Sequence, residues 1–225
     1  MKDGLSRSAL GCSEQPENAT PLGIAQKALD LTEILPLSDE EKIAGITKHF
    51  SAIMQILGLD LNDDNLHGTP RRVAKMYVNE IFSGLDEYNK PDATLFENKY
   101  QYNGMLLEKN ITFHSVCAHH FMPFYGKVHL AYYPNNAVIG LSKINRLVQY
   151  YASRPQVQEL LTIQIADGMK DILKTQHVAV MIEAVHLCVA ARGIKDTQSA
   201  TATSQYSGKF LREEHKCEFL SQVKA

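Results

Sequence analysis

Hydrophobic residues recur at helical spacing in two segments of the first half of the chain, residues 38–58 and 69–84. The first segment opens with a capping box, in which Ser38 and a glutamate three residues later each bond the other's backbone N–H. The second opens with Thr69 as its cap and a proline at the first helical position. The pattern predicts two helices, followed by an irregular connection over residues 85–105 with room for one short strand.

From about residue 109 the hydrophobic period changes to two, which is typical of strands. Four strands and two helices are expected: strands over 110–118 and 127–133, helices beginning at Ser142 and Pro155, and strands over about 177–191 and 199–206. Ser142 is the expected cap of the first of these helices. The order strand-strand-helix-helix-strand-strand, behind two N-terminal helices, predicts the α+β class.

The first 37 residues differ from the rest, because they are polar and are interrupted by three prolines. We expect residues 1–37 to form a partly disordered N-terminal arm, with at most a short helix around residues 24–31. A single domain should follow over residues 38–225. Its helical part spans 38–105 and its sheet-containing part spans 106–225.

Composition and charge exclude several classes of protein. With 225 residues, 44% of them hydrophobic and 21% charged, the chain is long and apolar enough to bury a core. A net charge of -2 gives no general attraction to nucleic acid or to an anionic membrane. The chain has no apolar run of spanning length and no secretory signal at its start. Four scattered cysteines form no disulfide framework, so we expect a cytoplasmic protein with reduced thiols.

The strongest chemical signal is a turn that carries Cys117, His119 and His120. The C-x-x-H spacing of Cys117 and His120 suits two ligands of one soft or borderline metal. Such a spacing alone is weak, because cysteine and histidine are often ordinary buried residues. Two ligands also do not hold a metal, so further ligands must come from elsewhere in the chain.

A second element supplies the missing ligand. In an extended strand, His186 and Cys188 lie two residues apart and project from the same face. A thiol and an imidazole on an apolar strand need a polar partner, which a metal shared with Cys117 and His120 would provide. Cys117, His120 and Cys188 then leave one position for water, as at a catalytic zinc. A Cys117–Cys188 disulfide is the competing interpretation, and it leaves the histidines unexplained.

Basic residues near predicted helix starts form a second candidate site. They are Arg72 and Lys75 in one helix, Lys143 and Arg146 beside Ser142 in another, and Arg192 after the apolar strand. Cations at a helix N-terminus oppose its macrodipole, and a bound anion held by free N–H groups would resolve the conflict. Each pair alone could be a solvated helix face. Two such pairs together make a polyphosphate ligand plausible.

Gln158 and Glu159 lie in the expected first turn after Pro155. A carboxylate beside an amide can bind a planar group with adjacent N–H donors, such as guanine. A glutamate in a first helical turn also stabilises the helix without any ligand. The residues alone leave both interpretations open.

These segments together resemble GTP cyclohydrolase I, the zinc-dependent type I family. The similar segments are Thr69–Tyr77, Cys117–His120, Gly140–Arg146, Arg154–Glu159, Val185–Cys188 and Ala191–Gly193. The likeness runs from about residue 40 to the C-terminus. It implies the tunnelling fold, whose strand-strand-helix-helix-strand-strand unit has the order expected above, with residues 106–225 as the catalytic part.

The resemblance implies an activity and a partner. The expected reaction is the hydrolytic opening of the imidazole ring of GTP, with release of formate and rearrangement to 7,8-dihydroneopterin triphosphate. This is the first step of tetrahydrofolate and pterin biosynthesis. GTP is the expected small-molecule substrate, with no nucleic acid or membrane partner. A homodecamer with active sites at subunit interfaces is also implied.

The resemblance assigns roles by position. Zn²⁺ would be held by Cys117, His120 and Cys188, where it lowers the pKa of a bound water to about 7. His119 and His186 would be the catalytic histidines. The triphosphate site would comprise Arg72, Lys75, Ser142, Lys143, Arg146 and Arg192, and the guanine anchor Gln158 and Glu159.

One position departs from the family pattern. The usual Cys-Glu-His-His is here Cys-Ala-His-His, with Ala118 in place of the glutamate. The expected metal ligands are retained, whereas a carboxylate beside the substrate is lost. Two alternatives therefore stay open: a divergent tunnelling-fold paralogue that acts on another purine or pterin, and a structural-zinc protein that binds phosphorylated ligands without turnover.

Overall fold

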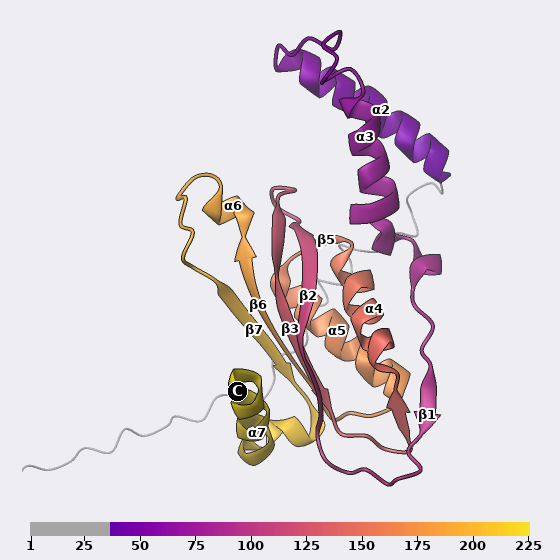
Figure 1. Cartoon of the computed structure of the whole chain (residues 1–225), viewed down its shortest axis with the longest axis vertical. Helices are drawn as coiled ribbons and strands as arrows, with labels where there is room; N and C mark the ends of the chain where they lie inside the picture. The colour runs from indigo at the N-terminus through magenta and orange to yellow at the C-terminus, as the bar shows by residue number, and fades with distance from the viewer. Residues whose placement is uncertain (1–36) are drawn as a thin grey trace, which may run out of the picture. The chain divides into compact units, whose positions relative to one another are not determined.

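A five-stranded sheet lies at the centre of the fold, in the spatial order β5-β2-β3-β6-β7 (Figure 1). Its strands are β2 (Leu106–Cys117), β3 (Pro123–Tyr132), β5 (Pro155–Gln156), β6 (Val178–His186) and β7 (Thr201–Tyr206). Neighbours run antiparallel, except that β5 runs parallel to the end of β2. The computed structural model describes residues 37–225, so the short helix and nearly all of the arm expected in residues 1–37 lie outside the described part.

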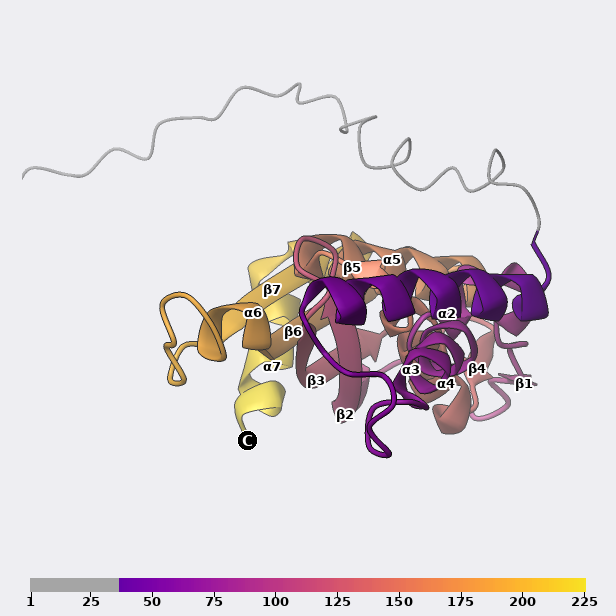
Figure 2. The same cartoon turned by 90° about the horizontal axis from the view of Figure 1, so that it is seen from above.

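Helices cover both faces of this sheet (Figure 2). They are α4 (Leu141–Ala152), α5 (Gln158–Leu173) and α7 (Glu213–Lys224). In β3, Leu130 and Tyr132 pack in the core with α4 and α5, whereas the intervening Ala131 packs with Phe219 of α7 on the other face. Successive strand residues alternate between faces, and here both faces are partly buried. This explains why the last three residues of β3, Leu130 to Tyr132, are all buried.

The predicted order of elements is confirmed. β2 and β3 precede α4 and α5, and β6 and β7 follow them, so the protein is α+β as expected. The connection over residues 85–105 contains the expected short strand, β1 (Leu95–Glu97), which pairs with β4 (Ala137–Ile139). This two-stranded ribbon is separate from the main sheet.

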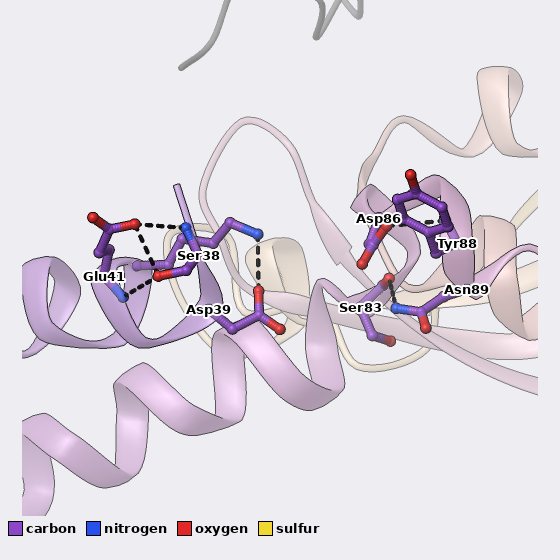
Figure 3. A network of polar contacts seen from close by, with 8 residues as sticks. Ser38, Asp39, Glu41, Ser83, Asp86, Tyr88 and Asn89 are labelled. Atoms are coloured by element: carbon purple, nitrogen blue, oxygen red, sulfur yellow. Dashed lines mark hydrogen bonds and ion pairs between the residues drawn. The ribbon is translucent and has the colours of Figure 1, made fainter. Parts of the chain in front are cut away.

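The capping box predicted at the start of the first helix is present (Figure 3). The Ser38 backbone N–H donates to the Glu41 carboxylate over 2.8 Å, and the Glu41 N–H donates to the Ser38 hydroxyl over 3.3 Å. The helix, α2 (Asp39–Ile56), packs against α3 (Thr69–Met76). Within residues 37–225 no helix is both long and apolar enough to cross a membrane.

Three predicted helix starts are wrong in detail. The residues before α3 and α4, Gly68 and Gly140, are the N-caps, and neither helix has a side-chain cap bond. Thr69 and Ser142 therefore lie within the helices. Pro155 belongs to β5, and α5 begins three residues later at Gln158. Hydrogen bonding to the end of β2 holds residues 155 and 156 extended, which the local sequence does not reveal.

The strand predicted over 177–191 is also wrong at its end. β6 stops at His186, and Leu187–Ala190 forms the short helix α6. The last pair between β6 and β3 joins His186 to Phe124, and β7 pairs only as far as Ala184. Residues beyond His186 have no neighbouring strand to bond, so their apolar sequence continues as a helical turn.

Gly126 in β3 lets β6 approach closely. A methyl group at Gly126 would overlap the backbone carbonyl oxygen of Glu183, which belongs to the paired strand. Gly126→Ala should lower the free energy of unfolding by about 1–3 kcal/mol in urea denaturation. Gly45→Ala is the matched control, because Gly45 is an exposed position of α2 with open space around it. The control should raise stability by up to about 1 kcal/mol, and equal effects of both changes would contradict this account.

Tyr133 should make stability depend on alkaline pH. Burial, followed by its hydrogen bond to the Glu218 carboxylate and by the charges of Glu218 and Glu214, raises the pKa of Tyr133 to about 12. An ordinary tyrosine ionises near pH 10, so this side chain stabilises the fold fully below about pH 10 and loses that contribution as the pH rises toward 12. In urea denaturation at a series of pH values, Tyr133→Phe should show a shallower loss of stability above pH ~10 than the wild type. Identical slopes would show that the shift is absent.

Candidate functional site

Three side chains from distant parts of the sequence meet at one end of the sheet. The Sγ atoms of Cys117 and Cys188 and a ring nitrogen of His120 all lie within 4.8 Å of one another. Cys117 ends β2, and Cys188 lies in α6 directly after β6. Both strands are antiparallel to β3, which lies between them, so they are parallel to each other and end at the same edge. The sheet topology therefore brings Cys188 to the Cys117 turn.

A tight turn returns His120 toward Cys117. The backbone N–H groups of His120 and Phe121 both donate to the Cys117 carbonyl oxygen, over 3.4 and 2.9 Å. Phe121 adopts a positive φ of 53°, which turns the chain back into β3. Cys117 and Cys188 are free thiols, so the competing disulfide is not formed.

The chemistry of this group fits a divalent metal. Burial, and then the neighbouring Cys117 thiol, raises the pKa of Cys188. Ionising both thiols would place two negative charges close together, which a divalent cation would offset. Two sulfurs and one imidazole are the donors that soft and borderline metals prefer. Cys117, His120 and Cys188, the predicted ligands, are thus able to hold such a metal together.

Two further histidines lie beside this group. Nδ1 of His119 is 3.8 Å from the Cys117 sulfur. His186 precedes Cys188 by two residues, and its ring stacks on Phe124 with centroids 4.6 Å apart and planes 3° apart. Burial lowers the pKa of His186, and the negative charge of Glu159 opposes that shift. Of the two predicted catalytic histidines, His119 thus lies beside a predicted ligand in space, and His186 lies two residues from one in the chain.

The residues predicted to bind phosphate are accessible. Arg72, Lys75, Ser142, Arg146 and Arg192 are exposed and Lys143 is half-buried. Within residues 37–225, none of these basic side chains forms an ion pair with a carboxylate. Arg72 and Lys143 lie in the first turns of α3 and α4, where they remain available to an anion. Lys75, which was expected near a helix start, lies in the last turn of the short helix α3. The two sets lie on different helices, α3 and α4.

Two pockets formed by residues 37–225 lie away from the metal group. The larger, of about 660 Å³, lies beside Tyr102, Leu106 and Gln222 and holds none of the predicted site residues. A smaller one, of about 330 Å³, includes Arg146 together with Gly84 and other residues. The metal group is accessible from outside through His120, which is exposed.

Gln158 and Glu159 have opposite environments. Glu159 is exposed, as a ligand contact would require. Gln158 is only 2% exposed, and its amide bonds to β6, to β7 and to His186. The two residues were predicted to act together, and the fold separates them because successive positions at the start of α5 face the sheet and solvent in turn.

Comparison with known proteins identifies the family of this chain. The family model described as GTP cyclohydrolase I matches residues 46–224. The chain belongs to the GTP cyclohydrolase I family. A protein named GTP cyclohydrolase 1 from Flavobacterium johnsoniae is 53% identical over 188 residues, covering 84% of this chain and 84% of that protein.

Two further relatives of the same name extend this likeness. The one from Yersinia enterocolitica is 51% identical over 189 residues, which cover 84% of this chain and 86% of the relative. The one from Haemophilus ducreyi is 48% identical over 202 residues, which cover 89% of this chain and 91% of the relative. The resemblance inferred from the motifs is confirmed, and the chain is a GTP cyclohydrolase I family enzyme, a hydrolase.

The sequence did not predict that some residues would lie around the site. Phe124 stacks on His186, and Thr162 and Thr203 form a hydrogen-bonded chain with Gln158. The pairing of Phe124 with His186 depends on strand register across 62 positions of the chain, and no local pattern reports it. The only local signal was Gln158 itself, a polar residue at the start of an apolar helix.

Cobalt binding tests the ligand group. Added to the metal-free, reduced protein, Co²⁺ should give one equivalent of near-ultraviolet sulfur-to-metal charge-transfer absorption per chain. Cys188→Ser should lose most of this absorption, because one of the two sulfur donors is removed. Cys217→Ser is the matched control, since Cys217 is an exposed free thiol outside the group. Equal spectra for the two variants would exclude Cys188 as a ligand.

Proposed function

We propose that this chain converts GTP to 7,8-dihydroneopterin triphosphate with release of formate, at the group formed by Cys117, His120 and Cys188. The observation that carries the proposal is the convergence of these three donors within 4.8 Å in a chain of this family. The expected reaction is the first step of tetrahydrofolate and pterin biosynthesis. Reduced thiols are needed for it, which supports a cytoplasmic location.

Zn²⁺ is the metal that we propose for this site. Two thiolates and one imidazole suit zinc, and three protein donors are the number found at catalytic rather than structural zinc sites. When bound, zinc supplies Lewis acidity that lets water act as a nucleophile near neutral pH. The chain's own contribution is to bring the donors together at the sheet edge and to leave the exposed side of His120 open to a substrate.

His119 and His186 are the proposed proton-transfer residues. Ring opening, formate release and the rearrangement of ribose each require protons to be added and removed. The two imidazoles come from different elements, one from the Cys117 turn and one from the end of β6. Two groups are therefore available for proton transfers at different atoms of the substrate.

The triphosphate is proposed to bind the unpaired cations. The charges of Lys143, Arg146 and Arg192, with Arg72 and Lys75, would offset the charge of the phosphates, while the Ser142 hydroxyl donates a hydrogen bond. Glu159 is the proposed guanine anchor, because its exposed carboxylate can accept from adjacent N–H groups. The prediction that Gln158 shares this contact is not supported by its burial.

We further propose a homo-oligomer, a decamer by family resemblance, with active sites between subunits. The metal group lies at one end of the sheet, where His120 is exposed. β7 is an edge strand of the main sheet, and neighbouring subunits would cover such an edge. A second subunit would also cover the exposed side of His120.

Incubation of the zinc-loaded protein with GTP tests the proposal. Formate and, after oxidation, fluorescent neopterin should both form from GTP, and Cys188→Ser should lose both products. Cys217→Ser should keep them, as its thiol lies outside the metal group. Binding of GTP without ring opening would overturn the proposal and favour a phosphate-binding protein with a structural zinc.

The Ala118 substitution motivates a second arm of this experiment. Ala118 stands where the family usually has glutamate, so the substrate preference could have changed. GTP should be compared with ATP, GDP and dihydroneopterin triphosphate under the same conditions. Turnover of one of these in place of GTP would identify a paralogue with another substrate.

A further inference from the structure

The buried amide of Gln158 is the feature with the most polar contacts near the proposed site. Its Nε2 lies 3.2 Å from the Ile182 carbonyl oxygen, 2.9 Å from the Thr201 carbonyl oxygen and 3.1 Å from the Thr203 hydroxyl. Its Oε1 lies 2.8 Å from Nε2 of His186. A side chain that is 2% exposed with every polar atom engaged has no free group for a substrate.

These partners fix the orientation of the amide. The backbone oxygens of Ile182 and Thr201 can only accept hydrogen bonds, so the group facing them must be the NH₂. The flipped amide would place its own oxygen against both carbonyl oxygens and leave them without a donor. Such an arrangement is costly in a buried site. Oε1 is therefore held toward His186.

Two threonines complete the same assignment. The Thr162 hydroxyl donates to the backbone carbonyl oxygen of Gln158 over 2.8 Å, and this bond uses the one hydrogen of the hydroxyl. Thr203 lies 2.7 Å from Thr162, so Thr203 must donate in this pair. The Thr203 oxygen can then accept from the Gln158 amide. With the NH₂ group of Gln158 facing β6 and β7, every donor in this hydrogen-bond network has an acceptor.

The orientation of the amide determines which nitrogen of His186 carries hydrogen. Oε1 of Gln158 can only accept, so Nε2 of His186 must donate, and in the neutral ring Nδ1 is then unprotonated. Phe124 stacks in parallel on the same ring and limits its rotation. We infer that Gln158 is a positioning residue, which fixes the tautomer and orientation of His186 so that Nδ1 can take a proton from the substrate. This inference rests on the proposed function and replaces the guanine contact expected for Gln158.

Gln158→Met tests this role, because methionine has a similar length and lacks both amide atoms. In the zinc-loaded protein kcat should fall by about 10- to 100-fold, the usual effect of removing a residue that orients a site group. KM for GTP and the zinc content should each stay within about twofold of the wild type. A retained kcat with KM raised tenfold or more would instead identify Gln158 as a substrate contact and overturn the inference.

Thr203→Val is the matched control within the same network. It removes one of the three acceptors of the amide and keeps the Ile182 and Thr201 carbonyl oxygens, which are sufficient to orient Oε1. Its kcat should therefore remain within about threefold of the wild type. A loss as large as that of Gln158→Met would mean that general packing, rather than the bond to His186, governs activity.

A double-mutant cycle asks whether Gln158 acts through His186. In a His186→Ala background, Gln158→Met should change residual activity by less than about twofold, because the bond between the two is already absent. A full additional loss would show independent action and overturn the inference.

Neutron diffraction from crystals grown in D₂O gives a readout that needs no turnover. At mildly alkaline pH, where imidazole is neutral, deuterium should lie on Nε2 of His186 and not on Nδ1. Deuterium on Nδ1 alone would overturn the inference, whether or not Gln158→Met folds. If the chain does not open GTP, the proposed function fails while the tautomer is still decided by this measurement.

Discussion

The central place of β3, between β2 and β6, is the constraint on which the site depends. Both neighbours pair antiparallel with β3 over nine registered positions each, so both end at the same edge. The Cys117 turn and α6 follow those ends directly. A metal group assembled from residues 117, 120 and 188 needs no long loop, because the sheet itself determines where its parts lie. Gly126 belongs to this constraint, since any side chain there would separate β3 from β6.

Burial affects both the pKa of His186 and the orientation of the Gln158 amide, two groups near the metal group. The same packing that buries Phe124 completely places it flat against His186 and lowers the pKa of that imidazole. Gln158 is buried at the start of α5, where an unsatisfied amide would cost about 1–3 kcal/mol. Its bonds to β6 and β7 remove that cost and leave a single acceptor directed at His186. Fold stability and the orientation of a proposed catalytic group thus depend on the same contacts.

The residues predicted to bind phosphate differ from these buried groups. The predicted phosphate-binding side chains are exposed, except the half-buried Lys143, and the basic ones have no acidic partner in residues 37–225, so their charges contribute little to folding. Arg72 and Lys143 lie on the first turns of α3 and α4, whose N-caps are glycines without a side-chain bond. Free backbone N–H groups at those ends, together with unpaired cations, are what an anion requires. This part of the proposed site is ready for a ligand at little cost to the fold.

The sequence by itself determined the α+β class, the order of the main strands and helices, the capping box and the candidate metal ligands. These depend on periodicity, short spacings and local hydrogen bonds, all of which are local in the chain. Only the tertiary structure decided where β6 ends, that Pro155 is extended, and that Gln158 faces His186 while Glu159 faces solvent. Those outcomes depend on which strand is available as a neighbour and on what must be satisfied when a polar group is buried. Pairing partners lie tens of residues away, so no local pattern could report them.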